Sequence, residues 1–360
     1  TLTIPAGTFD KAGTSTTVSQ DIEFYIGKGG KDESGDASVY GLLGGGSAIA
    51  LQSKDFSQDA VNQNGALATA TTGNITINLQ NRHIATGDEK GALITDLRGM
   101  YDGLEGMGQS GGRVETVLGW FEKLGSGALR TPGVTFGVMG GGLAVGYQAG
   151  LTNIEGAAAT HAVAETGKVT LNISGGYNVA VAGGSIALAS GPDTALEYPP
   201  LASATTNGVE MNVSGGESVG LMGGGFVSFV GTNEPAQTVQ AKSEVKGDTK
   251  IKVANEGTKV DGLVGGGWSF DDSNSSNTNV LMHSENVSIT LGEGTLVSKV
   301  SVDALGMHDP SNIEADKPGV RTVAKEILST FDEAQIAVLG GGIASGVNAT
   351  DKAGTQVDSV

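Results

Sequence analysis

Runs of three glycines recur in this chain, inside segments whose other residues favour β-strands. The copies are Gly44–Gly46, Gly140–Gly142, Gly223–Gly225, Gly265–Gly267 and Gly340–Gly342, with a degenerate sixth copy at Ala182-Gly183-Gly184. Copies that begin at residues 140, 182, 223 and 265 are separated by about 42 residues, a period typical of stacked repeat units. Glycine weakens an isolated strand. Its repetition therefore predicts positions where the backbone bends or where neighbouring units approach closely.

Each repeat also carries a segment in which apolar and mostly polar residues alternate with a period of two. This pattern indicates a half-buried strand and occurs at Ile22–Ile26, Ile75–Leu79, Val169–Ile173, Val209–Val213, Thr249–Val253 and Val287–Leu291. Further strands are expected just upstream, at Leu201–Thr206 and Thr238–Val245, and Asn207-Gly208 could close a β-hairpin. Thr355–Val360 has the pattern of the first strand of a seventh unit.

Two longer insertions interrupt the repeat, near residues 81–132 and 301–334. Within them, Arg113–Leu124 and Val320–Phe331 place apolar residues at the i, i+3, i+4, i+7 spacing of an amphipathic helix. Because loops and insertions on a rigid scaffold often carry binding residues, these two segments are where we expect specific contacts.

These patterns predict a single all-β repeat domain over residues 1–360, built from about six units. The favoured fold is a parallel β-solenoid, in the form of a right-handed β-helix with two helical insertions. The alternative is a six-bladed β-propeller, since six units of four strands could also close into a ring. The polar outer face of the alternating strands favours the solenoid, because propeller blades pack both of their faces against neighbours.

Composition excludes several classes of function. The chain has 39 acidic and 21 basic residues and a net charge of −18, which disfavours binding to nucleic acid. It contains no cysteine, so disulfides and thiolate chemistry are excluded. No apolar run is long enough to predict membrane insertion of this segment. The chain begins at Thr1, which is expected of a processed or excised piece.

No motif predicts a catalytic centre, a metal site or a cofactor. The four histidines are scattered and lack metal-ligand spacing: His83, His161, His283 and His308. Four acidic residues before the second insertion lack the spacing of a calcium loop: Asp303, Asp309, Glu314 and Asp316. Asp271-Asp272 follow Trp268, but adjacent strand residues point to opposite faces, so we expect a solvated turn there. Weak candidates for ligand binding are Trp120, Trp268, Asp271 and Asp272.

The repeat resembles a known class of bacterial proteins. Val169-Thr-Leu-Asn-Ile-Ser-Gly-Gly176, followed by Val179-Ala-Val-Ala-Gly-Gly184, is similar to the glycine-rich coils of autotransporter-type adhesin passenger regions. The resemblance covers roughly residues 21 to 350, without the two insertions. It implies a right-handed β-helix that is secreted or displayed on the bacterial cell surface. It also implies a role in virulence-related cell adhesion, with a host glycan, a host protein receptor or a second copy as partner.

The expected function is therefore non-enzymatic: an extracellular surface protein that mediates adhesion or self-association through a rigid β-repeat scaffold. The alternative is a glycan-binding or glycan-degrading β-helix protein of the phage-tail or polysaccharide-processing type. A hydrolase or lyase needs carboxylates from neighbouring coils on one face. Only Asp261, Asp271 and Asp272 are candidates for that role.

Overall fold

The chain winds into a parallel β-solenoid. The structure, a computed structural model, describes residues 14–27, 37–52, 67–83, 85–90, 133–148, 160–190, 200–230, 241–272, 278–299, 337–346 and 352–360. Within these residues every strand pairing is parallel, from β1 with β5 at one end to β18 with β22 at the other. This confirms the predicted solenoid. The propeller alternative is wrong, because the coils stack on one another instead of forming separate blades.

Each coil contributes strands to four columns. Column 1 holds β1 (Thr14–Ser19), β5 (Leu67–Thr72), β9 (His161–Thr166), β12 (Leu201–Thr206), the first parts of β15 (Ala241–Val253) and β18 (Thr278–Leu291), and β22 (Lys352–Ser359). Column 2 holds β2 (Ile22–Ile26), β6 (Ile75–Leu79), the first parts of β10 (Val169–Ala182) and β13 (Val209–Met222), and the later parts of β15 and β18.

Columns 3 and 4 complete the coil. Column 3 holds β3 (Val39–Leu43), β7 (Val134–Met139), the later parts of β10 and β13, β16 (Lys259–Val264), β19 (Leu296–Ser298) and β20 (Val338–Leu339). Column 4 holds β4 (Ser47–Gln52), β8 (Leu143–Gln148), β11 (Ile186–Ser190), β14 (Phe226–Val230), β17 (Trp268–Asp272) and β21 (Ile343–Gly346), which form a separate six-stranded sheet.

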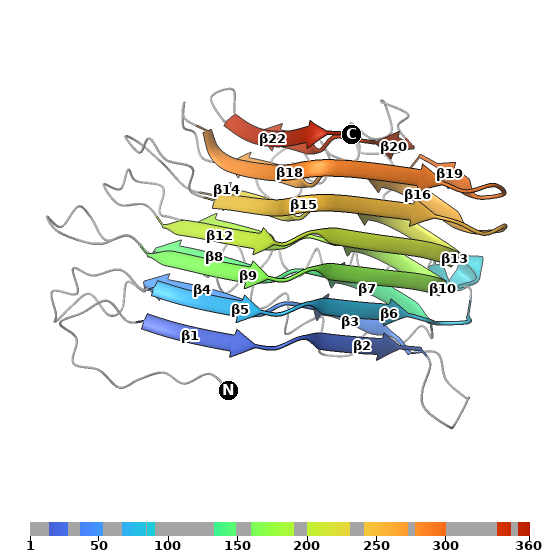
Figure 1. The fold of residues 1–360 in the computed structure, drawn as a ribbon, viewed down its shortest axis with the longest axis horizontal. Coiled ribbons are helices and arrows are strands. Elements are labelled where there is room, and N and C mark those ends of the chain that lie inside the picture. Colours follow the sequence, from blue (N-terminus) through green and yellow to red (C-terminus); the bar gives the residue numbers. More distant parts are fainter. Residues whose placement is uncertain are drawn as a thin grey trace, which may run out of the picture.

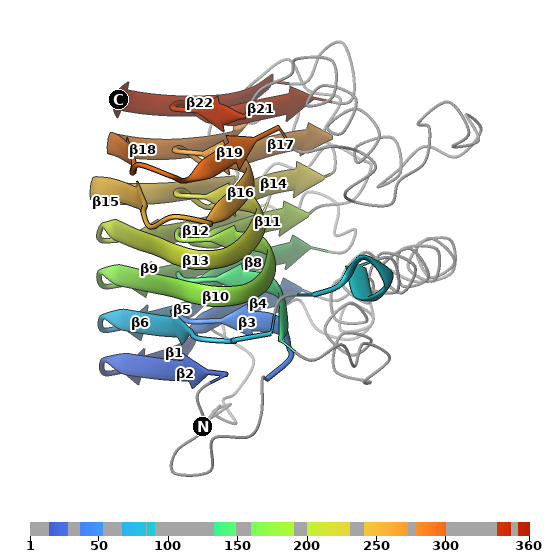
Figure 2. The ribbon, with the colours of Figure 1, turned by 90° about the vertical axis from the view of Figure 1, so that its right-hand side faces the viewer.

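The four columns form two walls. Columns 1 and 2 lie side by side in front in Figure 1, while columns 4 and 3 lie behind them, and β10 and β13 curve around one end from front to back in Figure 2. Between columns 2 and 3 the core is filled by large apolar side chains that include Ile77, Leu171, Met211, Leu221 and Leu263. Between columns 1 and 4 it is built largely of alanine, such as Ala68, Ala144, Ala162, Ala187 and Ala202.

The strands expected from the sequence pattern fall into these columns. All six alternating segments are strands of column 2, in one continuous register. Leu201–Thr206 is β12. β22 does belong to a seventh coil, but it lies in column 1, so the prediction that Thr355–Val360 is another strand of the alternating, column 2 type is wrong. The expected hairpin at Asn207-Gly208 is wrong: it is a corner between columns 1 and 2, with a φ of 92° at Gly208, because successive strands here never pair with each other. The predicted helices Arg113–Leu124 and Val320–Phe331 lie outside the described residues.

The glycine triplets lie where column 3 passes into column 4, in the middle of the back wall. A Cβ atom added to the first glycine of a triplet would collide with a side chain that begins the column 2 strand opposite; for Gly44 this is Ile75, and for Gly223 it is Thr249. A Cβ added to the second glycine would collide with the next coil's backbone. We call this stack of triplets the glycine waist, because the backbone of the back wall lies directly against side chains of the front wall there.

The degenerate triplet is one residue later than the sequence suggested. The amide of Gly183 donates to Met222 O, just as the amide of Gly140 donates to Ala182 O, so the copy is Gly183-Gly184-Ser185 and not Ala182-Gly183-Gly184. Ser185 fits the third position because its hydroxyl lies 2.5 Å from Thr206 Oγ1 across the waist. The amide of Gly142 also donates to Ser185 Oγ at 3.1 Å. These two contacts of its hydroxyl accommodate the serine side chain at a position that glycine occupies in the other coils.

A second column of unusual backbone runs through column 3. Gly41, Gly137, Gly220 and Gly262 occupy equivalent positions in successive coils, and all have φ between 67° and 76°. The third coil has Ala180 at this position, with a φ of 55°. This left-handed conformation is strained for alanine but not for glycine.

We expect Ala180→Gly to raise the free energy of unfolding by about 0.5–1 kcal/mol, because relief of the left-handed strain exceeds the extra chain entropy of glycine. The matched change Gly220→Ala should lower it by a similar amount, since no atom lies closer than 4.0 Å to the added Cβ. Urea denaturation followed by tryptophan fluorescence measures both values. Equal effects of the two variants, with the same sign, would contradict this explanation.

We expect Gly224→Ala to destabilise the protein by more than about 3 kcal/mol, beyond ordinary overpacking, because the collision is with backbone. The added Cβ would lie 2.5 Å from Gly267 N and 2.7 Å from Gly266 C. Gly341 is the control: it has the same place in the last triplet, yet a Cβ there meets nothing within 4 Å. If Gly341→Ala lowers the denaturation midpoint as much as Gly224→Ala does, the waist is not the cause.

Candidate functional site

The residues proposed for ligand binding do not form one site. Trp120 lies outside the described residues. Trp268 is half-buried on the outer side of column 4, where its ring packs edge-to-face on Phe226 with centroids 5.3 Å apart. Its indole N–H is buried and has no hydrogen-bond partner in the described part of the chain. This ring is packed against protein and does not offer an open platform for a sugar.

Of the three candidate carboxylates, Asp261 and Asp271 lie in different columns. Asp271 pairs with buried Phe229 and is itself 0% exposed, so its side chain occupies an inner position of β17. The expected solvated turn is therefore wrong for Asp271, because column 4 continues through it as a strand. Asp261 belongs to β16 in column 3 and accepts a hydrogen bond from Ser298 Oγ. The side chain of Asp272 lies outside the described residues. Asp261 and Asp271 thus occupy different columns and do not form an acid–base pair.

An asparagine ladder follows the outer face of column 2. Asn78, Asn172 and Asn212 occupy the same row in β6, β10 and β13. Asn172 Nδ2 donates to Asn78 Oδ1 at 2.9 Å, and Asn212 Nδ2 donates to Asn172 Oδ1 at 3.1 Å. Each amide is thereby occupied by its neighbours in the adjacent coils. The ladder stabilises the stack and leaves few polar atoms free to bind a ligand.

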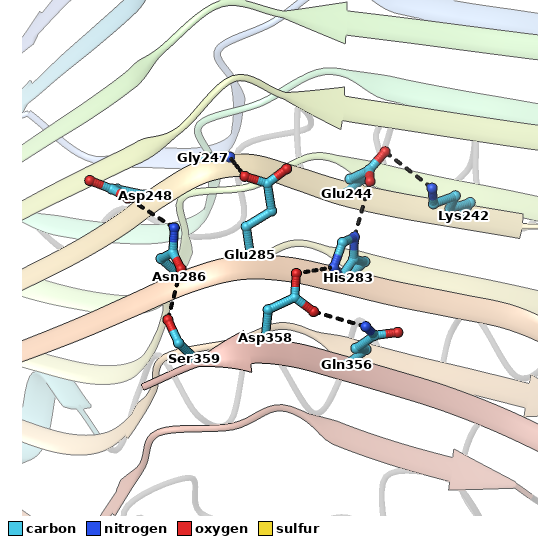
Figure 3. A network of polar contacts seen from close by, with 10 residues as sticks. All are labelled: Lys242, Glu244, Gly247, Asp248, His283, Glu285, Asn286, Gln356, Asp358 and Ser359. Carbon is cyan, nitrogen blue, oxygen red and sulfur yellow. Dashed lines mark hydrogen bonds and ion pairs between the residues drawn. The ribbon is translucent and has the colours of Figure 1, made fainter.

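A polar network on the front wall at the C-terminal end joins β15, β18 and β22 (Figure 3). His283 Nδ1 lies 3.0 Å from Glu244 Oε1, and His283 Nε2 lies 3.1 Å from Asp358 Oδ2. Lys242 Nζ donates to Glu244 Oε2 at 3.1 Å, and Gln356 donates to Asp358 Oδ1 at 2.8 Å. The His283 imidazole on β18 therefore connects a carboxylate of the preceding coil, Glu244, with one of the following coil, Asp358.

Electrostatics favours the charged form of this histidine. Partial burial disfavours the imidazolium, but hydrogen bonds and charges from Glu244 and Asp358 outweigh it and raise the pKa of His283. Partial burial also disfavours the charged form of Glu244, but hydrogen bonds from His283 and Lys242 outweigh burial and lower the pKa of Glu244. Hydrogen bonds from Gln356 and His283 also lower the pKa of Asp358. These groups form an ion-paired clamp on β22.

A second cluster marks the start of the first insertion, on the outer side of column 3. Thr86 and Glu89 cap a helical turn reciprocally: the amide of Thr86 donates to Glu89 Oε2 at 2.7 Å, and that of Glu89 donates to Thr86 Oγ1 at 3.3 Å. Lys90 Nζ then reaches Glu217 Oε1 at 2.6 Å and lies 4.9 Å from the centre of the Tyr177 ring. The insertion therefore begins packed against the back wall.

This second cluster does not supply a general base. Burial, together with the charges of Glu217 and Asp261, raises the pKa of Tyr177 to about 12. Its phenol therefore stays protonated near neutral pH. Glu217 is already paired with Lys90. The arrangement anchors the insertion and has no feature of an acid–base site.

The described histidines and acids hold no metal centre. In the residues that the structure describes, no group of three or more histidine or acidic side chains is placed to bind a metal ion. His283 bridges the two acids of its clamp, and His83 Nε2 lies 2.8 Å from Glu89 Oε2. His308 and the acidic residues Asp303, Asp309, Glu314 and Asp316 lie outside the described part. No described helix is long and apolar enough to cross a membrane.

Comparison of the chain with protein-family models, with curated proteins and with solved structures finds no significant match in any of the three. The resemblance to adhesin passenger regions therefore rests on the repeat pattern alone. Functional inference has to come from the geometry of the stack.

Sequence reasoning missed the clamp around His283. The signal was present, because Glu244 and His283 each stand a few residues before the column 2 strand of consecutive units. The register places them side by side as partners. Asp358 lies within the predicted seventh-unit strand, but His283 pairs with Gln356 and reaches Asp358 only diagonally. Because Glu244 and His283 stand at different distances from their column 2 strands, only the register of the folded coils brings the three residues together.

We expect the attachment of β22 to depend on pH. The pKa of His283 is raised in the folded protein, so the stabilisation that its charged imidazole gives to β22 is complete below the ordinary histidine pKa of 6.5. This stabilisation is lost as the pH rises through the raised pKa. The lowered pKa values of Glu244 and Asp358 have the opposite effect, and their contribution is lost only in acid. Attachment is therefore strongest at mildly acidic pH.

Hydrogen-exchange protection factors of the β22 amides measure this dependence. They should fall between pH 6 and pH 8.5, whereas those of β10 and β13 should not change. His283→Gln, which cannot carry the charge, should have lower β22 protection at pH 6 and little change with pH. A fall of the same size in the His283→Gln variant would exclude the clamp as its cause.

Proposed function

We propose that this chain is a non-enzymatic extracellular surface protein that mediates adhesion or self-association through a rigid β-solenoid. The observation that carries the proposal is the continuous stack: successive coils pair strand on strand in parallel register, and outer asparagines of neighbouring coils bind one another. Stacks of this kind are rigid and present extended faces that repeat proteins use for binding.

The outer polar residues support a scaffold more than an enzyme. Several carboxylates on the front wall are bound to lysine, histidine or asparagine side chains, as in the pairs Lys168–Glu210 and Lys250–Asp248. Hydrolysis of a glycosidic bond needs two carboxylates held about 5 to 10 Å apart across a substrate. Asp261 and Asp271, which were candidates for this chemistry, lie in different columns. Their separation favours the non-enzymatic function.

The glycan-processing alternative is therefore the weaker proposal. The extracellular location follows from the resemblance to adhesin passenger regions and is part of the proposal. A host glycan, a host protein receptor and a second copy of the chain remain the proposed partners, and the two insertions remain proposed contact segments. No cofactor and no nucleic acid is proposed.

Binding to immobilised surfaces tests this function. The purified chain should bind at least one of three surfaces in biolayer interferometry: a glycan panel, a set of host matrix proteins, or the chain itself. It should release no reducing sugar from a panel of polysaccharides. Robust sugar release would overturn the proposal in favour of the enzyme, and absence of binding to all three surfaces would overturn adhesion and self-association alike.

A further inference from the structure

One inner row of column 3 is polar in the middle of the solenoid. In consecutive coils the row reads Val39, Thr135, Asn178, Ser218, Val260 and Val297. It faces inward, because Val260 belongs to the main core, and Val39 and Val297 pack against that core. We call the three polar members, Thr135, Asn178 and Ser218, the inner polar row. Each of them is 0% exposed, so polar side chains lie here where other coils place valine.

Every member of the inner polar row has a buried atom without a partner. Thr135 Oγ1, Asn178 Oδ1 and Ser218 Oγ make no hydrogen bond to any residue that the structure describes. A buried polar atom that lacks a protein partner costs free energy, and in most proteins such an atom is bonded to an ordered water. Three such atoms side by side in successive coils therefore indicate a bound group that forms hydrogen bonds.

The corner between columns 2 and 3 explains why a polar residue is useful in this row. Asn178 Nδ2 donates to Gly175 O at 3.0 Å, so the row supplies the hydrogen-bond donor for a carbonyl of the corner. In the fifth coil the corner supplies its own donor, because Thr258 Oγ1 donates to Ala254 O at 2.7 Å, and the row residue there is Val260. The amide of Asn178 is thus held by its nitrogen, which leaves its oxygen to accept.

The spacing of the coils matches one water between neighbouring members of the row. Neighbouring strands lie about 4.8 Å apart, and no direct hydrogen bond joins either hydroxyl to Asn178. Two long amides can close this gap, as Asn172 and Asn78 do at 2.9 Å on the outer face, but a hydroxyl is shorter. A water that makes two hydrogen bonds of about 2.8 Å at a tetrahedral angle spans about 4.6 Å.

The chemistry of the row favours water over an ion. Among the described residues of this row, from Val39 to Val297, none carries a charge. A cation buried there would therefore lack the charged partner that it needs. Water needs no such partner, because it donates to the Asn178 oxygen, which can only accept, and accepts from hydroxyls, which can donate.

We propose that Asn178 Oδ1 binds two buried waters, one shared with Thr135 Oγ1 and the other shared with Ser218 Oγ. This internal site is independent of the proposed surface function. It is sealed on the outer side of column 3 as well, since the neighbouring outer residues Val134 and Tyr177 are 0% and 3% exposed. The two waters therefore exchange with solvent only when the wall opens, and they stay bound much longer than surface waters.

Oxygen-17 relaxation dispersion of the solvent counts such long-lived internal waters. Thr135→Val and Ser218→Val should each lower the count by about one, and the double variant by about two, because each change removes one hydroxyl partner. The matched controls Thr135→Ser and Ser218→Thr keep the hydroxyl and should leave the count unchanged. Valine already occupies this row in other coils, and circular dichroism with the urea midpoint establishes that the variants are folded.

A crystal structure of the unsubstituted chain gives a second test that depends on no variant. It should show two ordered waters within hydrogen-bond distance of Asn178 Oδ1, and crystals grown with rubidium should show no anomalous peak in the row. Direct hydrogen bonds from Thr135 and Ser218 to Asn178 would overturn the proposal. A rubidium peak would replace the waters by a monovalent cation, and an unchanged water count in both valine variants would exclude the site.

Discussion

The close approach of the two walls at the glycine waist determines how the rest of the solenoid is built. Without side chains at Gly223 and Gly224, the backbone of the back wall lies directly against side chains of the front wall and against the backbone of the next coil. The waist lies between two parts of one continuous core. Alanine fills the part between columns 1 and 4, and leucine, isoleucine and methionine fill the part between columns 2 and 3. Hydroxyl groups such as that of Thr72, which accepts from the Gly46 amide at 2.8 Å, satisfy the backbone between them.

Stacking in register also explains why the outer face carries so little chemistry. A polar side chain in one coil stands beside the equivalent side chain of the next, so neighbouring residues satisfy each other. Asn172 binds Asn78, and His283 binds Glu244, before either can serve a ligand.

The sequence allowed much of the fold to be predicted, because period-two alternation and repeated glycines are local signals. The six column 2 strands and the seventh-coil strand follow from them. The one-residue error at Ala182 arose because Ser185 replaces a glycine through a hydrogen bond to Thr206, which lies 21 residues later. Burial of Asp271 and the Glu244–His283–Asp358 clamp depend on register between coils. Such register is a long-range property that a linear pattern does not contain.

Because each coil repeats the rows of the previous one, this architecture tolerates some changes of length much better than others. Loss of one residue within a column strand would turn the following side chains to the opposite face and expose the core. Loss or duplication of a complete coil would leave every row continuous, since the coils before and after it carry matching positions. A lineage of such proteins can therefore vary the reach of the scaffold in steps of one coil while its cross-section stays constant.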